Sequence, residues 1–219
     1  VEYYQKAADQ GNINAQYNLG TLYVRGLGVV QDYTKGAKYY QKAADQGIAY
    51  FQGKLGFLYY RGLGVDLDYK KAFEYYQKAA DQGDTNSQVN LGTLYKLGQG
   101  VYKDYKKAIE YYQKAADQGD AYAQYNLGTL YDRGLGVVQD YKKAVEYYQK
   151  AADQGNADAQ SNLGTLYKMG QGVDQDYNKA AEFYQKAADQ GISYSQGKLG
   201  YLYYHGLGVD KDYKKSFEY

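Results

Sequence analysis

The sequence repeats itself with a strict period of 36 residues. The tripeptide Asp-Gln-Gly recurs six times with no insertion or deletion between copies, beginning at Asp9, Asp45, Asp81, Asp117, Asp153 and Asp189. A fixed period of this length indicates an array in which each copy is one supersecondary unit. Because a single unit cannot cover both of its apolar faces, neighbouring units must stack. The sequence therefore predicts one continuous array over residues 1–219.

Each copy contains two stretches of helical length, separated by the motif Gly-x-Gly-Val. In the fourth copy, the first stretch places Ala123, Leu127 and Leu130 at offsets that share one face of a helix. The second stretch does the same with Ala144 and Tyr148, and this spacing is incompatible with the alternation of a strand. Each repeat is therefore predicted to be a helical hairpin, and the fold class to be all-α.

The ends of the two helices carry their own signals. Asp140, like the aspartate at the same position of every copy, precedes the second helix and is a good N-cap. The first helix has Asn or Asp at its start in most copies, but Ile48 and Ile192 cannot cap it. After the first helix, the first glycine of Gly-x-Gly-Val, for example Gly134, suits a left-handed C-terminal position. We therefore expect a positive φ at each of these glycines.

These units predict an α/α superhelical solenoid of antiparallel helix pairs. Because Val1 and Tyr219 both align with the middle of a second helix, we expect the chain to be a fragment of a longer array. The expected units are a partial repeat at 1–11, repeats at 12–47, 48–83, 84–119, 120–155 and 156–191, and an incomplete last repeat at 192–219.

Several short motifs characterise the repeat, and in the fourth copy they are Tyr125-Asn126-Leu127-Gly128, Leu130-Tyr131, Gly134-x-Gly136-Val137, Asp140, Lys143-Ala144, Tyr147-Tyr148, Lys150-Ala151-Ala152 and Gln154-Gly155. With these motifs the repeat resembles the Sel1-like repeat over essentially the whole chain. The period separates it from the related tetratricopeptide repeat, which has 34 residues, and the two extra residues fall in Gly-x-Gly-Val. The resemblance implies a tetratricopeptide-like solenoid that serves as an adaptor or scaffold for protein complexes.

Composition argues against several other classes of function. The 26 basic and 25 acidic side chains give a net charge of +1, so no field attracts nucleic acid, and a nucleic-acid-binding repeat is the weaker alternative. No apolar run approaches the roughly 20 residues that cross a bilayer, so membrane insertion is not expected. The chain has no cysteine and a single histidine, His205, while its carboxylates cap helices or precede a lysine by four residues. We therefore expect no enzyme, cofactor or metal site.

Positions that differ among the copies are free of the packing rules that fix the others. On the first helix these positions form one face, at Tyr122, Tyr125, Thr129 and Asp132 in repeat four, which we call the variable face. In tetratricopeptide-like arrays this face lines a concave groove. The predicted partner-binding residues are Tyr50, Lys54, Phe57 and Tyr60 in repeat two, Lys96 in repeat three, Tyr122 and Tyr125 in repeat four, and Tyr194, Lys198, Tyr201 and Tyr204 in repeat six.

Tyrosine supplies a large contact area and a hydroxyl at low entropic cost, which favours these aromatic residues as anchors for a partner. Because 33 of the 219 residues are tyrosine, the alternative is that the aromatic patches only seal repeats two and six. The leading hypothesis is a scaffold that binds a protein or peptide in the concave groove. The alternative is a structural array that self-associates head to tail.

Overall fold

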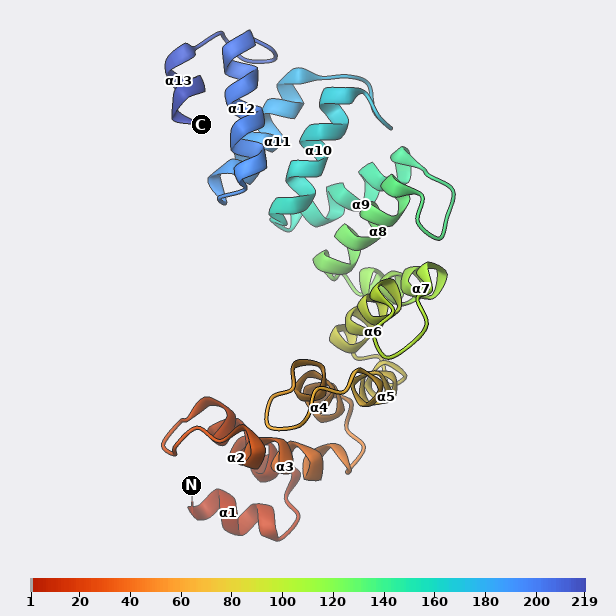
Figure 1. The fold of residues 1–219 in the computed structure, drawn as a ribbon, viewed down its shortest axis with the longest axis vertical. Coiled ribbons are helices and arrows are strands. Elements are labelled where there is room, and N and C mark those ends of the chain that lie inside the picture. The colour runs from red at the N-terminus through yellow and green to blue at the C-terminus, as the bar shows by residue number, and fades with distance from the viewer. Residues whose placement is uncertain (1) are drawn as a thin grey trace. The chain divides into compact units, whose positions relative to one another are not determined.

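The computed structural model describes residues 2–219, and these form α-helices joined by short turns, with no β-strand among them (Figure 1). The helices follow one another as hairpins whose two members pack together, as in α2 with α3 and α4 with α5. The helices are α1(Glu2–Asp9), α2(Ile13–Arg25), α3(Tyr33–Ala44), α4(Ala49–Arg61), α5(Tyr69–Ala80), α6(Thr85–Leu97), α7(Tyr105–Asp117), α8(Ala121–Arg133), α9(Tyr141–Asp153), α10(Ala157–Met169), α11(Tyr177–Asp189), α12(Ser193–His205) and α13(Tyr213–Glu218).

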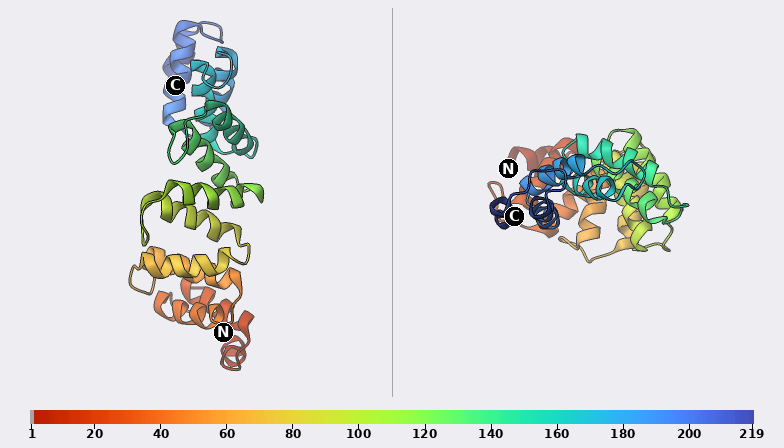
Figure 2. Two further views of the ribbon diagram at one scale, coloured as in Figure 1. Left: turned by 90° about the vertical axis from the view of Figure 1, so that its right-hand side faces the viewer. Right: turned by 90° about the horizontal axis from the view of Figure 1, so that it is seen from above.

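The chain divides into two compact units, one ending at Tyr111 and the other beginning at Tyr112. In the first unit, each helix from α1 to α5 packs against the helix that follows it in the chain. In the second unit, the same relation holds from α8 to α13. Figure 2 shows consecutive helices lying alongside one another. The predicted fold class, an α/α solenoid of helical hairpins, is confirmed.

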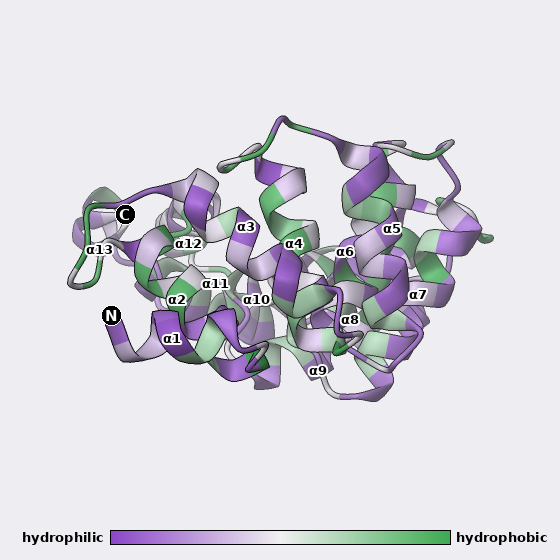
Figure 3. Ribbon diagram, turned by 90° about the horizontal axis from the view of Figure 1, so that it is seen from below, coloured by the Kyte–Doolittle hydropathy of each residue, from purple (hydrophilic) through white to green (hydrophobic). Residues whose placement is uncertain are grey.

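The predicted helical faces are the buried ones. Ala123, Leu127 and Leu130 of α8, together with Ala144 and Tyr148 of α9, have no exposed surface. The helices visible in Figure 3 carry both hydrophobic and hydrophilic residues, as amphipathic helices do. The core is therefore a series of small apolar clusters, each shared by the helices of a repeat and its neighbour.

The predicted helix ends are also confirmed. The Asp140 carboxylate accepts a hydrogen bond from the backbone N–H of Lys143 at 3.0 Å, whereas Ile48 and Ile192 make no side-chain cap bond. The first glycine of each Gly-x-Gly-Val has a φ between 63° and 72°, the left-handed region that a β-carbon disfavours. These glycines are Gly26, Gly62, Gly98, Gly134, Gly170 and Gly206.

The second glycine of the motif has a different role, which the sequence did not reveal. A β-carbon on Gly172 would lie 2.4 Å from the carbonyl oxygen of Tyr141, and one on Gly208 would lie 2.2 Å from that of Tyr177. Each of these tyrosines begins the second helix of the preceding repeat. The second glycine is therefore needed because the turn lies directly against the neighbouring copy.

In the hairpins of repeats one, two, four and five, a tyrosine of the second helix lies on a glycine of the first. A β-carbon on Gly128 would lie 2.6 Å from the ring of Tyr148, and one on Gly164 would lie 2.7 Å from the ring of Tyr184. Both tyrosines are fully buried. The glycine thus sets how closely the two helices of a repeat approach.

Polar side chains connect one repeat to the next. The Tyr75 hydroxyl donates to Gln41 Oε1 at 3.0 Å, and Gln82 Nε2 donates to Gln52 Oε1 at 2.9 Å. The same tyrosine–glutamine bond recurs in four further pairs, Tyr39–Gln5, Tyr111–Gln77, Tyr147–Gln113 and Tyr219–Gln185. Phe183 stands at this position in repeat five and has no hydroxyl to donate.

Many lysines of the second helices lie over tyrosine rings. The Lys143 ammonium lies 5.1 Å from the centre of the Tyr131 ring, and that of Lys150 lies 5.5 Å from the centre of the Tyr147 ring. The glutamate–lysine pairing expected at a spacing of four is present between Glu182 and Lys186, at 2.7 Å. Some lysines that follow a glutamate by four residues, such as Lys150, therefore make a cation–π contact with an aromatic ring.

Substitution of the packed glycine tests the hairpin geometry. We expect Gly128→Ala to lower the free energy of unfolding by about 1–3 kcal/mol, because the new methyl group overlaps the Tyr148 ring. Gly197 of α12 is the control: nothing lies within 4 Å of its added β-carbon, so Gly197→Ala should raise stability by about 0.5–1 kcal/mol. Denaturant melts measure both, and a stabilised Gly128→Ala variant would refute the packing role.

Burial of the tyrosines makes stability depend on alkaline pH. Burial raises the pKa of Tyr40, Tyr76, Tyr148 and Tyr184, that of Tyr184 to about 12. Unfolded tyrosine titrates near pH ~10, so the stability from these groups is complete below that pH and is lost as pH rises through the folded pKa values. We expect the helices to unfold and the buried tyrosines to ionise in the same transition, between pH ~10 and ~12. Circular dichroism and tyrosinate absorbance measure this, and full tyrosine titration with intact helices would contradict it.

Candidate functional site

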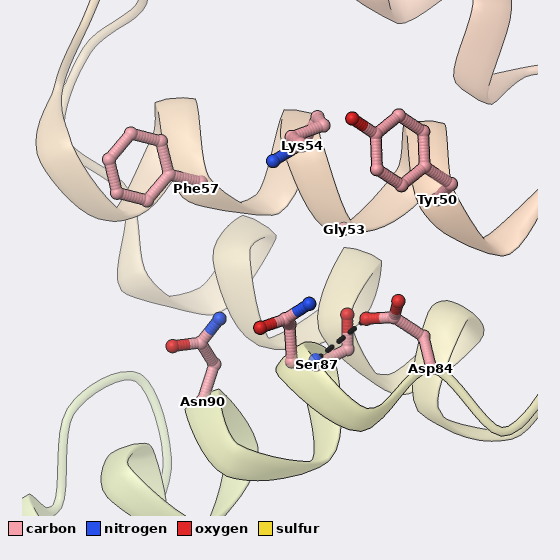
Figure 4. A pocket seen from close by; sticks show the side chains of 8 residues that line it. Tyr50, Gly53, Lys54, Phe57, Asp84, Ser87 and Asn90 are labelled. Carbon is pink, nitrogen blue, oxygen red and sulfur yellow. Dashed lines mark hydrogen bonds between the residues drawn. The ribbon is translucent and has the colours of Figure 1, made fainter. Parts of the chain in front are cut away.

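The variable face of α4 borders a hollow of about 240 Å³ between α4 and α6. Figure 4 shows Tyr50, Lys54 and Phe57 on α4, across from Ser87 and other polar side chains at the start of α6. Gly53 lies between the two rings on α4, and a β-carbon there would lie 2.8 Å from Ser87 Oγ. The structure thus brings together three of the four binding residues predicted for repeat two. The lining residues are Tyr50, Gly53, Lys54, Phe57, Asp84, Asn86, Ser87 and Asn90.

Tyr50 is held in place by residues of the preceding hairpin. Its hydroxyl shares a 2.8 Å hydrogen bond with that of Tyr17, and this bond raises the pKa of Tyr50 to about 12. The two ring centres lie 5.3 Å apart in an edge-to-face arrangement, and the Lys54 ammonium lies 5.1 Å from the centre of the Tyr50 ring. The side chain is still 47% exposed. Tyr50 is therefore a fixed aromatic surface rather than a freely moving one.

Phe57 removes a hydrogen bond that other repeats make. In repeat four, the buried Tyr148 hydroxyl donates to Thr129 Oγ1 at 3.3 Å. The equivalent tyrosine in repeat two is Tyr76, but Phe57 stands where the threonine would be, so the buried Tyr76 hydroxyl has no partner. Phe57 itself remains 43% exposed. In repeat two, therefore, a half-exposed aromatic side chain replaces the hydroxyl group that would pair with the buried tyrosine.

Gly53 removes a second bond in the same way. In the last repeat, Ser195 Oγ donates to Ser161 Oγ of the preceding first helix at 2.8 Å. The equivalent serine, Ser87, faces Gly53, and its buried hydroxyl has no partner. Both unpaired hydroxyl groups therefore result from substitutions on one face of α4, at positions 53 and 57.

The variable face of α12 borders a second hollow, toward α10. The Lys198 ammonium lies 4.9 Å from the centre of the Tyr194 ring, and that of Lys168 lies 5.2 Å from the centre of the Tyr201 ring. Both tyrosines are about half exposed, at 53% and 47%. This hollow has two lysines and no carboxylate among its lining residues, which are Lys168, Ser193, Tyr194, Gly197, Lys198 and Tyr201.

The remaining predicted residues lie outside both hollows. Tyr60 is half-buried with its ring 5.5 Å from Tyr69, and the exposed Tyr204 lies 5.3 Å from the Tyr213 ring. On α8, Tyr122 is exposed, whereas Tyr125 is half-buried and packs against the core beside Tyr148, with ring centres 6.0 Å apart. Lys96 is half-buried on α6. Tyr125 therefore contributes to core packing as well as to the variable face.

Sequence reasoning missed the polar side of the first hollow. Asp84, Asn86, Ser87 and Asn90 were not predicted as site residues, because their proximity to α4 depends on how two repeats stack. One feature of the sequence did point to this site. Most copies have threonine at the position of Phe57, so the buried tyrosine of repeat two lacks the hydroxyl partner that the threonine provides. Thr129 likewise belongs to the packing of Tyr148.

The side chains that line the two hollows are aromatic rings, lysines, hydroxyl groups, asparagine amides and one carboxylate, that of Asp84. Among residues 2–219, no three His, Asp or Glu side chains are close enough together to hold a metal ion. His205 is exposed, with its ring centre 4.4 Å from that of Tyr201. No helix in the described part of the chain is long and apolar enough to cross a membrane.

Stacked helical hairpins with aromatic residues on the first helices define an α/α repeat protein. The Sel1 repeat family model matches the chain from end to end, in consecutive segments at 1–12, 13–48, 49–84, 85–120, 121–156, 157–192 and 193–219. The chain belongs to the Sel1 repeat family, as the resemblance in its sequence indicated.

Solved structures of bacterial proteins share this fold. A protective antigen of uropathogenic Escherichia coli strains, described as having an SLR fold, is 38% identical, with a TM-score of 0.95 over 99% of this chain and 46% of that one. The chain thus spans less than half of the E. coli protein. A Sel1 repeat protein from Oxalobacter formigenes is 34% identical, with a TM-score of 0.85 over 99% and 89% of the two chains. No curated protein matches the sequence.

The two equivalent serines give a matched test of the unpaired hydroxyl. Ser87→Ala should raise the free energy of unfolding by about 1 kcal/mol, because it removes a buried group that has no partner. Ser195→Ala should lower it by about the same amount, because it breaks the bond to Ser161. Denaturant melts of both variants measure the difference, and equal effects at the two positions would show that Ser87 is paired in solution.

Proposed function

We propose that this chain is a protein-interaction scaffold whose α4 face, formed by Tyr50, Lys54 and Phe57, binds a partner protein or peptide. Sel1 repeat proteins generally serve as scaffolds for protein interactions, and the family is typically non-enzymatic. The aromatic face of α12, with Tyr194 and Tyr201, is a second candidate surface of the same kind. Both faces present half-exposed aromatic rings beside lysine ammonium groups. Tyrosine in particular is enriched at binding hot spots.

The observation that carries this proposal is the exchange of threonine for Phe57. An unpaired buried hydroxyl costs about 1–3 kcal/mol, and a half-exposed phenylalanine recovers only part of that through burial. The alternative, that the aromatic residues merely seal repeat two, predicts that they improve packing. Phe57 does the opposite, because it leaves the buried Tyr76 hydroxyl without a partner and so weakens the local packing. Natural proteins accept such local losses mainly at functional sites.

The substitution Phe57→Thr separates binding from folding. It recreates the threonine–tyrosine pair of repeats one, four and five, so we expect the free energy of unfolding to rise by about 1 kcal/mol. Affinity for a partner should fall by about 2 kcal/mol, as for a hot spot. The partner is represented by nonapeptides selected against the native chain from a random display library, and isothermal titration measures their affinity.

The reverse exchange is the control for stability. Thr129→Phe should destabilise the array by leaving the Tyr148 hydroxyl without its threonine partner, while the α4 face stays intact. A Phe57→Thr variant that is more stable and binds the selected peptides as well as the native chain does would exclude α4 as the binding face. Failure of the library to yield any peptide that binds the native chain would remove the proposed function itself.

A further inference from the structure

We propose that the hollow between α4 and α6 holds one uncharged apolar residue of an extended partner peptide, together with the main-chain amide beside it. This inference rests on the proposed function and specifies the chemistry that the partner presents at this site. It follows from the size of the hollow, its aromatic walls and the opposite charges on its two sides.

The size of the hollow favours a short piece of chain. Its volume of about 240 Å³ is below the ~300–1,000 Å³ that drug-sized ligands and cofactors occupy. It is open to the surface between two helices that run alongside each other, so a bound chain can enter and leave it. A single residue of a longer peptide fits this space, and the rest of the peptide follows the surface.

The walls favour an apolar side chain. Tyr50 and Phe57 are seven residues apart on α4, on the same face, and each has nearly half of its surface exposed. Gly53 lies between them and presents no side chain. An apolar side chain that enters the hollow contacts the aromatic wall that Tyr50 and Phe57 form and removes apolar surface from water, at about 25 cal/mol per Å². The Tyr17–Tyr50 bond holds one of these walls in position before binding.

The charges disfavour an acidic or basic side chain. Lys54 lies on the α4 side and Asp84 on the α6 side, and one oxygen of Asp84 accepts the Ser87 backbone N–H at 2.7 Å. A carboxylate in the hollow is attracted to Lys54 but repelled by Asp84. An ammonium group is attracted to Asp84 but repelled by Lys54. The α10–α12 hollow differs, because it has two lysines and no carboxylate in its lining.

An amide group matches the polar side of the hollow. A peptide bond carries one acceptor and one donor, and its carbonyl can accept from the Lys54 ammonium while its N–H donates to Asp84. Asn86 and Asn90 are four residues apart on α6, and each side-chain amide adds a further donor and acceptor beside the same space. The lining therefore satisfies a neutral main-chain segment better than any ion.

The decisive variant fills the hollow with a side-chain pair that this chain already uses. In repeats four and five, the positions equivalent to Gly53 and Ser87 are Tyr125 and Ala159. The double variant Gly53→Tyr/Ser87→Ala copies that pair, and the alanine removes the hydroxyl that lies 2.8 Å from an added β-carbon. We expect helicity to persist and affinity for library-selected nonapeptides to fall at least tenfold.

The matched control is Gly197→Tyr, the same exchange in α12, where an added β-carbon meets nothing within 4 Å. Because Gly197 lines the α10–α12 hollow, peptides that lose affinity in this variant bind the second candidate surface on α12. The peptides whose affinity stays within about twofold of native are the ones with which the α4–α6 hollow is tested. If peptides bind the filled double variant as tightly as the native chain, the inference about the hollow is wrong, while the proposed function stands. A chain that selects no peptide at all overturns both.

Peptide sequence and charge variants test the chemistry. We expect the selected peptides to share one uncharged apolar residue, and their affinity to change less than threefold between low and physiological salt. Asp84→Asn keeps the helix cap, as Asn12 and Asn156 do in other repeats, but removes the charge. This variant should select acidic peptides that the native chain rejects. Enrichment of acidic peptides by the native chain, with affinity falling steeply in salt, would show that the hollow binds an anion instead.

Discussion

The contact on which the rest of the structure depends is the tyrosine ring that lies on a helix glycine in repeats one, two, four and five. Glycine costs a helix interior about 1 kcal/mol relative to alanine, yet Gly20, Gly128 and Gly164 each lie where a β-carbon would overlap the facing ring. The close approach buries a whole tyrosine, but it also carries a hydroxyl into the core, and that hydroxyl needs a partner. The threonine that directly follows this glycine in the first helix is that partner, as at Thr21, Thr129 and Thr165. Phe57 stands out because it replaces this threonine and leaves the hydroxyl of Tyr76 without a partner.

The sequence predicted what lies within one helix and missed much of what depends on two. Periodicity placed Leu127 and Tyr148 in the core, and local chemistry predicted the cap at Asp140 and the left-handed Gly134, because each of these depends on a few adjacent residues. The second glycine of the turn was not explained, since its neighbour is the preceding repeat. The same limit applies to the site: the aromatic residues of α4 were predicted, whereas the polar residues of α6 became visible only once the two helices lay side by side.

Two helices of nearly identical sequence consequently border different hollows. The α4 sequence AYFQGKLGFLYYR and the α12 sequence SYSQGKLGYLYYH share the tyrosine, glycine and lysine of the variable face. The neighbours decide the chemistry: α6 contributes Asp84 and two asparagines to the first hollow, while α10 contributes Lys168 to the second. Specificity in such an array is therefore a property of pairs of adjacent repeats, and a patch of tyrosines on one repeat does not define a site.

The tyrosine–glutamine and glutamine–glutamine bonds between repeats join residues at constant separations of 34 and 30 positions. A genetic event that adds or removes one whole copy leaves the surviving bonds with the partner types they had before, because the copies supply the same donors and acceptors at these positions, apart from Phe183. An insertion of any other length shifts one half of the ladder against the other. Such a gene can change its copy number by unequal recombination while the protein stays folded, and each change places new pairs of first helices next to one another. The same bonds that hold the array together thus allow it to acquire new recognition surfaces without new point mutations.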